Sequence, residues 1–527
     1  MGFRISRLAR KLFSRRSNRL SSIDPDEILI DAENLPHFDT DRFEGRLEHP
    51  LSFRVFAALA LAIASTVMLF SWKLYALQVE AGAEYSYISE NHRLLHGVVF
   101  AERGVITDRN DTLLAWNEPS ENEVFPRRMY TEKPGFGHIL GYLSNPKRDQ
   151  NGYFFQTTYI GKDGAEKSFD RELAGENGLK LVEIDAVGDV VSESEQRPAR
   201  NGEKLTLSVD ARVQEELFNL IRQRAEDAPF TGGAGVILDI DTGEILALTS
   251  YPEYDPQVFS DGTDDERISY YFSDKHTPLL NRVTAGLYTP GSIVKPYVAI
   301  GALEEGTIDP AKSILSTGSI SIPNPYDDTK ETIFRDWKAH GWVDMREALA
   351  VSSNVYFFAV GGGFEDQKGL GIEKINDYAK LFGLGQTTGI NLTPEVEEEG
   401  LIPNPAWKEA TFDGEPWRLG DTYNSSIGQY GWQVTILQMA RAVAGIASGY
   451  LVTPSVQAKE DTKAVEHKKI PVEAENLEII REGMREVVRN GTGSGLNVPY
   501  VMVAAKSGTA ELGTTKSKVN SWITGYF

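Results

Sequence analysis

The stretch that decides the fold is GAGVILDIDTGEILALTS, residues 233–250. Two apolar runs, 233–240 and 244–250, flank the short linker Asp241-Thr242-Gly243, which is typical of a β-hairpin. Two more strand-like runs, 500–508 and 520–527, lie near the end of the sequence. Between them, helical patterns follow three positions: Ser292, Val343 and Trp432. Strands, then helices, then strands predict an α+β domain from residue 231 to 527, in which helices cover an antiparallel sheet.

Residues 73–230 precede this domain and show short β-like runs broken by turn signals such as RND, NPK, GKDG and NGEK. We expect a β-rich, non-catalytic module there. Residues 55–72, VFAALALAIASTVMLFSW, form an uncharged apolar run of the minimum length for one transmembrane helix. A cleaved signal peptide is disfavoured because the run lies far from the N-terminus and lacks a small-residue cleavage site. A buried core helix is disfavoured by the length of the run.

Charge predicts how the chain is oriented and which partners it lacks. Seven of the first 20 residues are Arg or Lys, so the positive-inside rule places residues 1–54 in the cytoplasm and the rest beyond the membrane. The net charge of −22 argues against nucleic acid, because no basic surplus is present to neutralise phosphates. The absence of cysteine excludes disulfides, thiolate metal sites and a cysteine nucleophile.

The first candidate for chemistry is the Ser-x-x-Lys motif of Ser292 and Lys295. Pro290-Gly291 ends a loop and Ser292 opens a predicted helix, so that the spacing i, i+3 places the lysine beside the serine. A serine hydroxyl needs such a base to become a nucleophile in acyl transfer. The motif alone is weak, because chance also supplies Ser144-x-x-Lys147, and a helix start with a solvated lysine is the ordinary alternative.

Two further motifs follow. Ser352 and Asn354 begin a predicted helix and offer a hydroxyl relay and an amide that can bind peptide groups. Lys506-Ser507-Gly508-Thr509 follows a strand-like run, although a strand end running into a turn would look the same. Lys506 can lower the pKa of Lys295 by like-charge repulsion, Gly508 lets substrate approach the strand, and the Thr509 N–H can stabilise an oxyanion.

The three motifs, in this order and after one membrane span, resemble the class B penicillin-binding proteins, the D,D-transpeptidases that cross-link peptidoglycan. The resemblance covers about residues 77–527, and several further segments carry it: Glu90–Arg93 (ENHR), Arg103–Asn110 (RGVITDRN, followed by Asp111 where glycine is usual), Tyr288–Ser292 (YTPGS) and Gly420–Gln429 (GDTYNSSIGQ). The run FRDWKAHGWVDMREALAVSSNVYFF, residues 334–358, resembles the elongation-type penicillin-binding protein 2 more than the division-type protein 3. Ile293 and Ser507 depart mildly from the family, which commonly has threonine at both positions.

The resemblance implies a role for each residue of the motifs. Ser292 would be the acylated nucleophile, Lys295 its base, Ser352 the proton shuttle and Asn354 an orienting group. Lys506 and Ser507 would hold the substrate carboxylate, Gly508 would lie beside the substrate, and the N–H groups of Ser292 and Thr509 would form the oxyanion hole. The implied partners are peptidoglycan stem peptides, β-lactams that bind covalently, a multi-spanning glycan-strand polymerase and other elongation-complex proteins.

Some elongation-type relatives are thought to hold a structural zinc through Asp, His and Cys. Asp336 and His340 occupy candidate positions here, but Ser353 adjoins the Ser-x-Asn motif and the chain has no cysteine. Such a pair is more often a hydrogen-bonded surface pair, so we expect no metal and no other cofactor.

Other functions stay open from the sequence: a division-type transpeptidase, a D,D-carboxypeptidase or β-lactamase-like hydrolase, and a non-catalytic β-lactam sensor or scaffold. The Glu-x-x-Leu-Asn motif of class A β-lactamases is absent. Phe527 lies within an apolar strand-like run, and in the family a further strand would lie between this run and residues 233–240, followed by a helix. We therefore expect the sequence to be a fragment that folds poorly alone.

Overall fold

The computed structural model describes residues 52–83, 94–150, 152–184, 190–459, 467–513 and 518–527. The predicted match at 90–93 and almost all of the cytoplasmic segment lie outside these residues. Residues 1–92 and 93–527 form two units. In the first unit, α1 (Phe53–Tyr75) continues into the π-helical turn η4 (Ala76–Glu80). Phe53–Glu80 is long and apolar enough to cross a membrane, as the sequence predicts.

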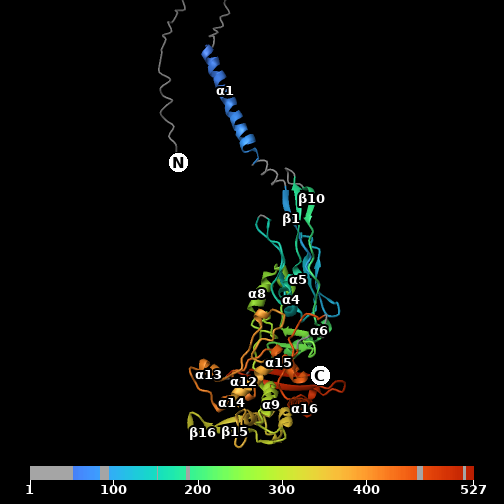
Figure 1. Ribbon diagram of the computed structural model, residues 1–527, viewed down its shortest axis with the longest axis vertical. Helices are drawn as coiled ribbons and strands as arrows, with labels where there is room; N and C mark the ends of the chain where they lie inside the picture. The colour runs from blue at the N-terminus through green and yellow to red at the C-terminus, as the bar shows by residue number, and fades with distance from the viewer. Residues whose placement is uncertain (1–51, 84–93, 151, 185–189, 460–466, 514–517) are drawn as a thin grey trace, which may run out of the picture. The chain divides into compact units, whose positions relative to one another are not determined.

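The β-rich module occupies the start of the second unit and is built on two mainly antiparallel sheets and two further pairs of short strands (Figure 1). One sheet has the order β1-β9-β10 and the other β11-β2-β3-β4, in which only the β11–β2 pairing is parallel. The elements are β1 (Leu94–Val99), β2 (Ile106–Thr107), β3 (Leu113–Glu118), β4 (Arg127–Tyr130), α3 (Gly137–Leu140), β5 (Leu143–Ser144), β6 (Lys147–Arg148), β7 (Phe154–Gln156), β8 (Ile160–Gly161), α4 (Gly164–Ser168), α5 (Asp170–Ala174), β9 (Gly178–Ile184), β10 (Val190–Arg197) and β11 (Leu205–Thr206).

A buried ion cluster lies inside this module. Arg103 Nε donates to Glu166 Oε2 at 2.5 Å, and Arg128 Nε donates to Glu166 Oε1 at 2.8 Å. All three side chains are 1 % exposed or less. Burial opposes ionisation of Glu166, but the charges of Arg128 and Arg103 hold the pKa of this carboxyl below its usual value. The cluster ties β4 to α4.

The predicted α+β domain is confirmed. The opening hairpin consists of β12 (Gly233–Leu238) and β13 (Ile245–Tyr251), with Val236 opposite Leu248. The closing hairpin consists of β20 (Ala504–Leu512) and β21 (Lys518–Tyr526), with Lys506 opposite Thr524. Helix α15 (Ile436–Ser448) contacts both β12 and β21, so it links the two antiparallel pairs.

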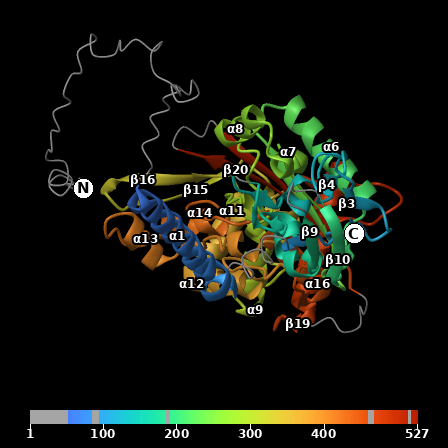
Figure 2. The same cartoon turned by 90° about the horizontal axis from the view of Figure 1, so that it is seen from above.

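The segment between the two pairs is mostly helical. Asp344 is the N-cap of α10 and Thr435 is the N-cap of α15, each in a capping box with the residue three positions later. The remaining elements are α6 (Ala211–Asp227), α7 (Pro256–Asp261), α8 (Asp265–Ser273), η5 (Gly291–Val294), α9 (Lys295–Glu304), β14 (Ile314–Ser316), β15 (Ser319–Asn324), β16 (Asp327–Arg335), β17 (Gly341–Val343), α10 (Met345–Ala350), α11 (Asn354–Gly362), α12 (Ile372–Leu381), η6 (Pro394–Val396), α13 (Pro405–Thr411), α14 (Leu419–Ser426), β18 (Tyr450–Leu451), β19 (Lys468–Lys469), α16 (Ala474–Asn490) and η8 (Ser494–Leu496). The hairpin β15–β16 packs on α11 and α14 through Ile320 and Phe334, and its far end projects outward (Figure 2).

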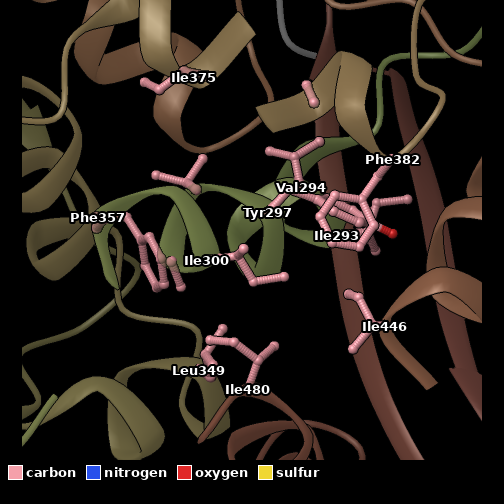
Figure 3. Close-up of a cluster of buried hydrophobic side chains, with 14 of the residues drawn as sticks. Ile293, Val294, Tyr297, Ile300, Leu349, Phe357, Ile375, Phe382, Ile446 and Ile480 are labelled. Carbon is pink, nitrogen blue, oxygen red and sulfur yellow. The ribbon is translucent and has the colours of Figure 1, made fainter. Parts of the chain in front are cut away.

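The main core surrounds α9, which α11, α12 and α16 contact. Figure 3 shows Val294, Tyr297 and Ile300 packed among side chains from other helices, including Leu349 and Phe357. Each fully buried side chain of this size contributes about 1.5–3 kcal/mol. The nucleophile candidate at the start of α9 therefore stands on a rigid element.

A second core joins residues on both sides of the predicted boundary at 230/231. Ile106 and Leu114 of the β-rich module pack in one buried cluster with Ile245 and Leu248 of β13. The boundary itself stays a prediction, but the two parts share hydrophobic packing.

The prediction of a strand at residues 500–508 is wrong for the first half of that range. Residues Tyr500 to Val503 form no strand, and β20 begins only at Ala504. Pro499 has no N–H for a strand ladder, and Tyr500 and Met502 point outward with 83 % and 77 % exposure. An apolar run alone does not reveal that these side chains face away from the sheet.

Candidate active site

The predicted nucleophile lies in a tight turn that leads into α9. Gly291 has φ +60°, and a Cβ atom there would lie 2.9 Å from the carbonyl oxygen of Thr509. The Gly291 N–H donates to the Gly428 carbonyl at 3.0 Å, which fixes the turn from a second side. Ser292 is partly exposed in the 3-10 turn η5, while the following Ile293 is buried. The turn therefore places Ser292 beside β20, which contacts η5.

Lys295 is the first residue of α9 and is fully buried. Its Nζ donates to the Ser352 carbonyl at 2.7 Å, to Ser352 Oγ at 3.2 Å and to Asn354 Oδ1 at 2.8 Å. The ring of Phe357 lies 5.4 Å from the same nitrogen. Three residues that the sequence predicts to act together, from α9 and from the start of α11, therefore meet at one buried amine.

Lys506 approaches the same point from β20. Its Nζ donates to Ser352 Oγ at 2.9 Å and to the Ser507 carbonyl at 2.9 Å. Ser352 Oγ is therefore shared by two buried lysines, one from each side. Gly508 packs closely against the turn, because a Cβ there would lie 2.9 Å from both the Pro290 carbonyl oxygen and a methyl of Ile293.

The electrostatics of the site favour a neutral base. Burial and then the charge of Lys506 lower the pKa of Lys295 well below the usual lysine value, against a smaller opposing effect of Asp336. Burial lowers the pKa of Lys506 to about 7. Near neutral pH, Lys295 can therefore accept a proton, which an ordinary lysine cannot do.

Ser352 has a strained backbone, with φ +58°. Residues other than glycine, asparagine and aspartate seldom adopt this left-handed conformation, and strain of this kind is common at functional sites. The flanking bond from the Ser353 N–H to the Ala348 carbonyl, at 3.0 Å, helps to hold it. The unusual conformation directs both the carbonyl and the hydroxyl of Ser352 toward Lys295.

The candidate zinc residues lie next to this strained serine. Asp336 and His340 are 3.6 Å apart, with side chains 0 % and 1 % exposed, so the expectation of a surface pair is wrong. Among the described residues, no group of three or more His, Cys, Asp or Glu side chains could hold a metal. Asp336 Oδ2 instead accepts three hydrogen bonds, from Ser353 Oγ at 2.8 Å, the Val355 N–H at 2.9 Å and Ser316 Oγ at 3.2 Å. The residues do not fit a zinc ion.

Sequence reasoning missed several contacts at the site. Thr492 Oγ1 lies 2.6 Å from Ser507 Oγ, so a second hydroxyl adjoins the predicted carboxylate pocket. Its only signal was the Gly-Thr-Gly turn at 491–493. Asn520 and Trp522 donate from β21 to the Thr289 carbonyl at 3.3 and 3.0 Å and support the nucleophile turn. No spacing in the sequence points to these two.

Comparison with known proteins agrees with this geometry. Residues 233–527 match the family described as "Penicillin binding protein transpeptidase domain". Residues 120–207 match the family described as "Penicillin-binding Protein dimerisation domain". The chain belongs to the penicillin-binding protein transpeptidase family.

Its relatives point to one branch of that family. The chain is 34 % identical over 401 residues to the peptidoglycan D,D-transpeptidase MrdA of Acinetobacter baumannii, covering 73 % of this chain and 56 % of the relative. It therefore spans little more than half the length of that relative.

Two solved structures are also similar. The complex between penicillin-binding protein 2 and MreC from Helicobacter pylori matches with a TM-score of 0.68 and 26 % identity, covering 82 % of this chain and 92 % of that chain. A structure on the coordination of polymerization and crosslinking by a peptidoglycan synthase complex matches with a TM-score of 0.65 and 25 % identity, covering 88 % and 89 % of the two chains.

Proposed function

We propose that this penicillin-binding protein is a peptidoglycan D,D-transpeptidase of cell-wall elongation. The observation that carries the proposal is that Lys295 and Lys506 both donate to the Ser352 hydroxyl. Lys295 itself lies one helical turn after Ser292. Such a site supplies a neutral base, a proton relay and a cation for a substrate carboxylate. The name of the Acinetobacter relative supports the transpeptidase activity, and the resemblance of residues 334–358 supports the elongation role.

The reaction follows from the proton positions. Neutral Lys295 takes the proton of Ser292 Oγ as this oxygen attacks the carbonyl carbon of the penultimate D-alanine. The N–H groups of Ser292 and Thr509 stabilise the oxyanion. As the C–N bond breaks, the proton passes from Lys295 through the Ser352 hydroxyl to the leaving amine of the terminal D-alanine. A Ser292 ester remains.

In the second half of the reaction, deacylation, the protons move along the same groups in the opposite direction. The amine of a neighbouring stem peptide attacks the ester carbonyl, and its proton returns through Ser352 to Lys295. The new amide forms as the bond to Ser292 Oγ breaks, and the oxygen regains its proton. Lys506 and Ser507 hold the terminal carboxylate of the donor peptide during acylation, and Asn354 orients both Lys295 and the peptide. A β-lactam would enter the same path and leave a stable ester.

The test uses the full chain in detergent with a pentapeptide donor and a labelled D-amino acid. Transfer of the label onto the tetrapeptide, together with penicillin labelling of the peptide that contains Ser292, is the expected result. Ser292→Ala must lose both reactions while keeping its thermal transition. Release of D-alanine by hydrolysis without transfer would instead show a carboxypeptidase, and labelling at another serine would contradict the assigned nucleophile.

We also propose that the cytoplasmic membrane holds the chain through α1, with the N-terminus in the cytoplasm, next to a glycan-strand polymerase. The apolar helix and the basic opening support the orientation, and the synthase-complex and MreC structures support partners of this kind. Because the chain has no cysteine, single cysteines can report topology. In intact cells, an impermeant maleimide should label Ser494→Cys and spare Asn18→Cys. The opposite pattern would reverse the orientation.

A further inference from the structure

A carboxylate that touches no substrate organises the relay side of the site. Asp336 follows the last residue of β16, and its buried Oδ2 accepts the hydrogen bonds of Ser353 Oγ, the Val355 N–H and Ser316 Oγ. Ser353 is the N-cap of α11 and also accepts from the Tyr356 N–H at 3.3 Å. Asp336 therefore binds the first turn of α11 directly, where a negative charge is favoured by the helix dipole.

The same strand end also holds Asn354. The Asn354 side chain donates from Nδ2 to the Arg335 carbonyl at 3.4 Å, while its Oδ1 accepts from Lys295 Nζ at 2.8 Å. Residues 335 and 336 thus fix both the direction of the Asn354 amide and the backbone on either side of it. Ser352, with its left-handed φ of +58°, lies immediately before this anchored turn.

We propose that Asp336 is a positioning residue that holds Ser352 and Asn354 in register with Lys295 through hydrogen bonds alone, without a metal ion. The proposal rests on the proposed acyl-transfer function, and it adds a residue that touches neither the substrate nor the reacting atoms. The hydroxyls of Ser316 and Ser353 and the Val355 N–H surround Oδ2 of the carboxylate, and Oδ1 accepts from the Trp337 N–H at 2.9 Å. A Val355 N–H aimed at Oδ2 is a donor, which a bound cation would repel.

Asp336 also acts on the base through its charge. The groups that face Lys295 are Lys506 from β20, Asp336 from the end of β16 and, more weakly, His340 from the same loop. Asp336 raises the pKa of Lys295 against burial and Lys506. Burial raises the pKa of Asp336, but hydrogen bonds from the Asn354 and Val355 N–H groups and from Ser353 lower it overall, so its carboxylate stays charged through neutral pH.

The test measures the second-order rate of penicillin acylation against pH for the full chain. Asp336→Asn should lower the plateau rate by on the order of 10- to 100-fold, the range found when an outer partner that orients site groups is removed. Loss of its negative charge should also move the acid midpoint to lower pH, because the pKa of Lys295 falls further. A purely structural role would lower the amount of folded protein and leave the midpoint in place.

Asp344→Asn is the matched control. Asp344 caps α10, which also leads to Ser352, and its side chain accepts from the Glu347 N–H at 2.9 Å. Its rate and midpoint should equal those of the unmodified chain. If Asp336→Asn lacks a cooperative thermal transition, Ser316→Ala replaces it, because this change removes one hydrogen bond to Asp336 and touches no catalytic group. We then expect a smaller fall of the plateau rate and an unchanged midpoint.

Three results would overturn the proposal. Asp336→Asn could acylate at the unmodified rate with the same midpoint. Where that variant does not fold, Ser316→Ala could acylate at the full rate. Finally, metal analysis of the purified chain could find one equivalent of zinc whose removal by a chelator stops acylation. Full acylation after chelation, with no bound metal, supports positioning by hydrogen bonds alone.

Discussion

Removing the charge of Lys506 should move the pH at which the enzyme begins to acylate. The ammonium nitrogens of Lys295 and Lys506 contact the same Ser352 Oγ, at 3.2 and 2.9 Å, so about 6 Å at most separates them. At an effective dielectric constant of about 20, two unit charges at this distance repel by about 3 kcal/mol. This energy corresponds to about 2 pH units in the protonation of Lys295.

The order of the two ionisations makes the effect visible. The charge of Lys506 helps to lower the pKa of Lys295, whereas burial alone lowers the pKa of Lys506, to about 7. Lys506 therefore acts as the charged partner while Lys295 gives up its proton. In Lys506→Met this repulsion is gone. The acid midpoint of acylation should therefore rise by up to about 2 pH units, even though weaker binding of the penicillin carboxylate also lowers the plateau.

The assay is stopped-flow or gel-based labelling with a fluorescent penicillin from about pH 5 to 9, with thermal unfolding as the check on folding. The unmodified enzyme should also lose rate above about pH 7, as Lys506 gives up the charge that binds the carboxylate. Lys506→Arg is the control, because its permanent charge should keep the acid midpoint and remove the alkaline decline. An acid midpoint in Lys506→Met that stays in place or falls would refute the electrostatic coupling of the two lysines.

Three further outcomes are expected. Glu166→Gln leaves the buried charges of Arg103 and Arg128 without their shared partner and should lower the free energy of unfolding by about 3–5 kcal/mol in denaturant titrations. Because the pKa of Glu166 is lowered in the fold, the unmodified protein should lose this stabilisation only as pH falls below about 4.5. A variant as stable as the parent at pH 7 would contradict the ion cluster. Gly291→Ala should destabilise the protein by about 1 kcal/mol or more and slow acylation, since its Cβ would press on the Thr509 carbonyl at a positive φ; an unchanged rate would show that the turn is not tightly held. The penicilloyl-enzyme should persist for many minutes, as measured by mass spectrometry after removal of free drug, and rapid turnover of a chromogenic cephalosporin would instead indicate a hydrolase.

The sequence was most informative where a pattern has a single structural solution. The hairpin around Asp241-Thr242-Gly243 and the long apolar run of α1 each combine periodicity with a boundary signal, and both form as predicted. Lys295, Ser352 and Asn354 were predicted to meet because their spacing resembles a known family, and they are hydrogen-bonded in the structure. Their individual roles stay predictions.

The sequence was least informative about contacts that depend on packing between distant segments. Asp336 was expected in a surface pair with His340, because a lone Asp/His pair is more often found there, yet contact with Ser316 of β14 helps to bury its carboxylate. Thr492 reaches Ser507 only because α16 ends beside β20. Such contacts have no period and no local motif, so only the folded chain reveals them.

The left-handed backbone of Ser352 places the stability of the protein and its activity in opposition at this position. A sequence chosen for stability alone would place glycine at position 352, because glycine adopts a φ of +58° without the cost that serine bears. That replacement should raise the melting temperature, and it would also delete the single oxygen that both buried amines share. Thermostabilised variants selected without an activity screen are therefore expected to accumulate glycine at this position and to lose their reactivity with penicillin.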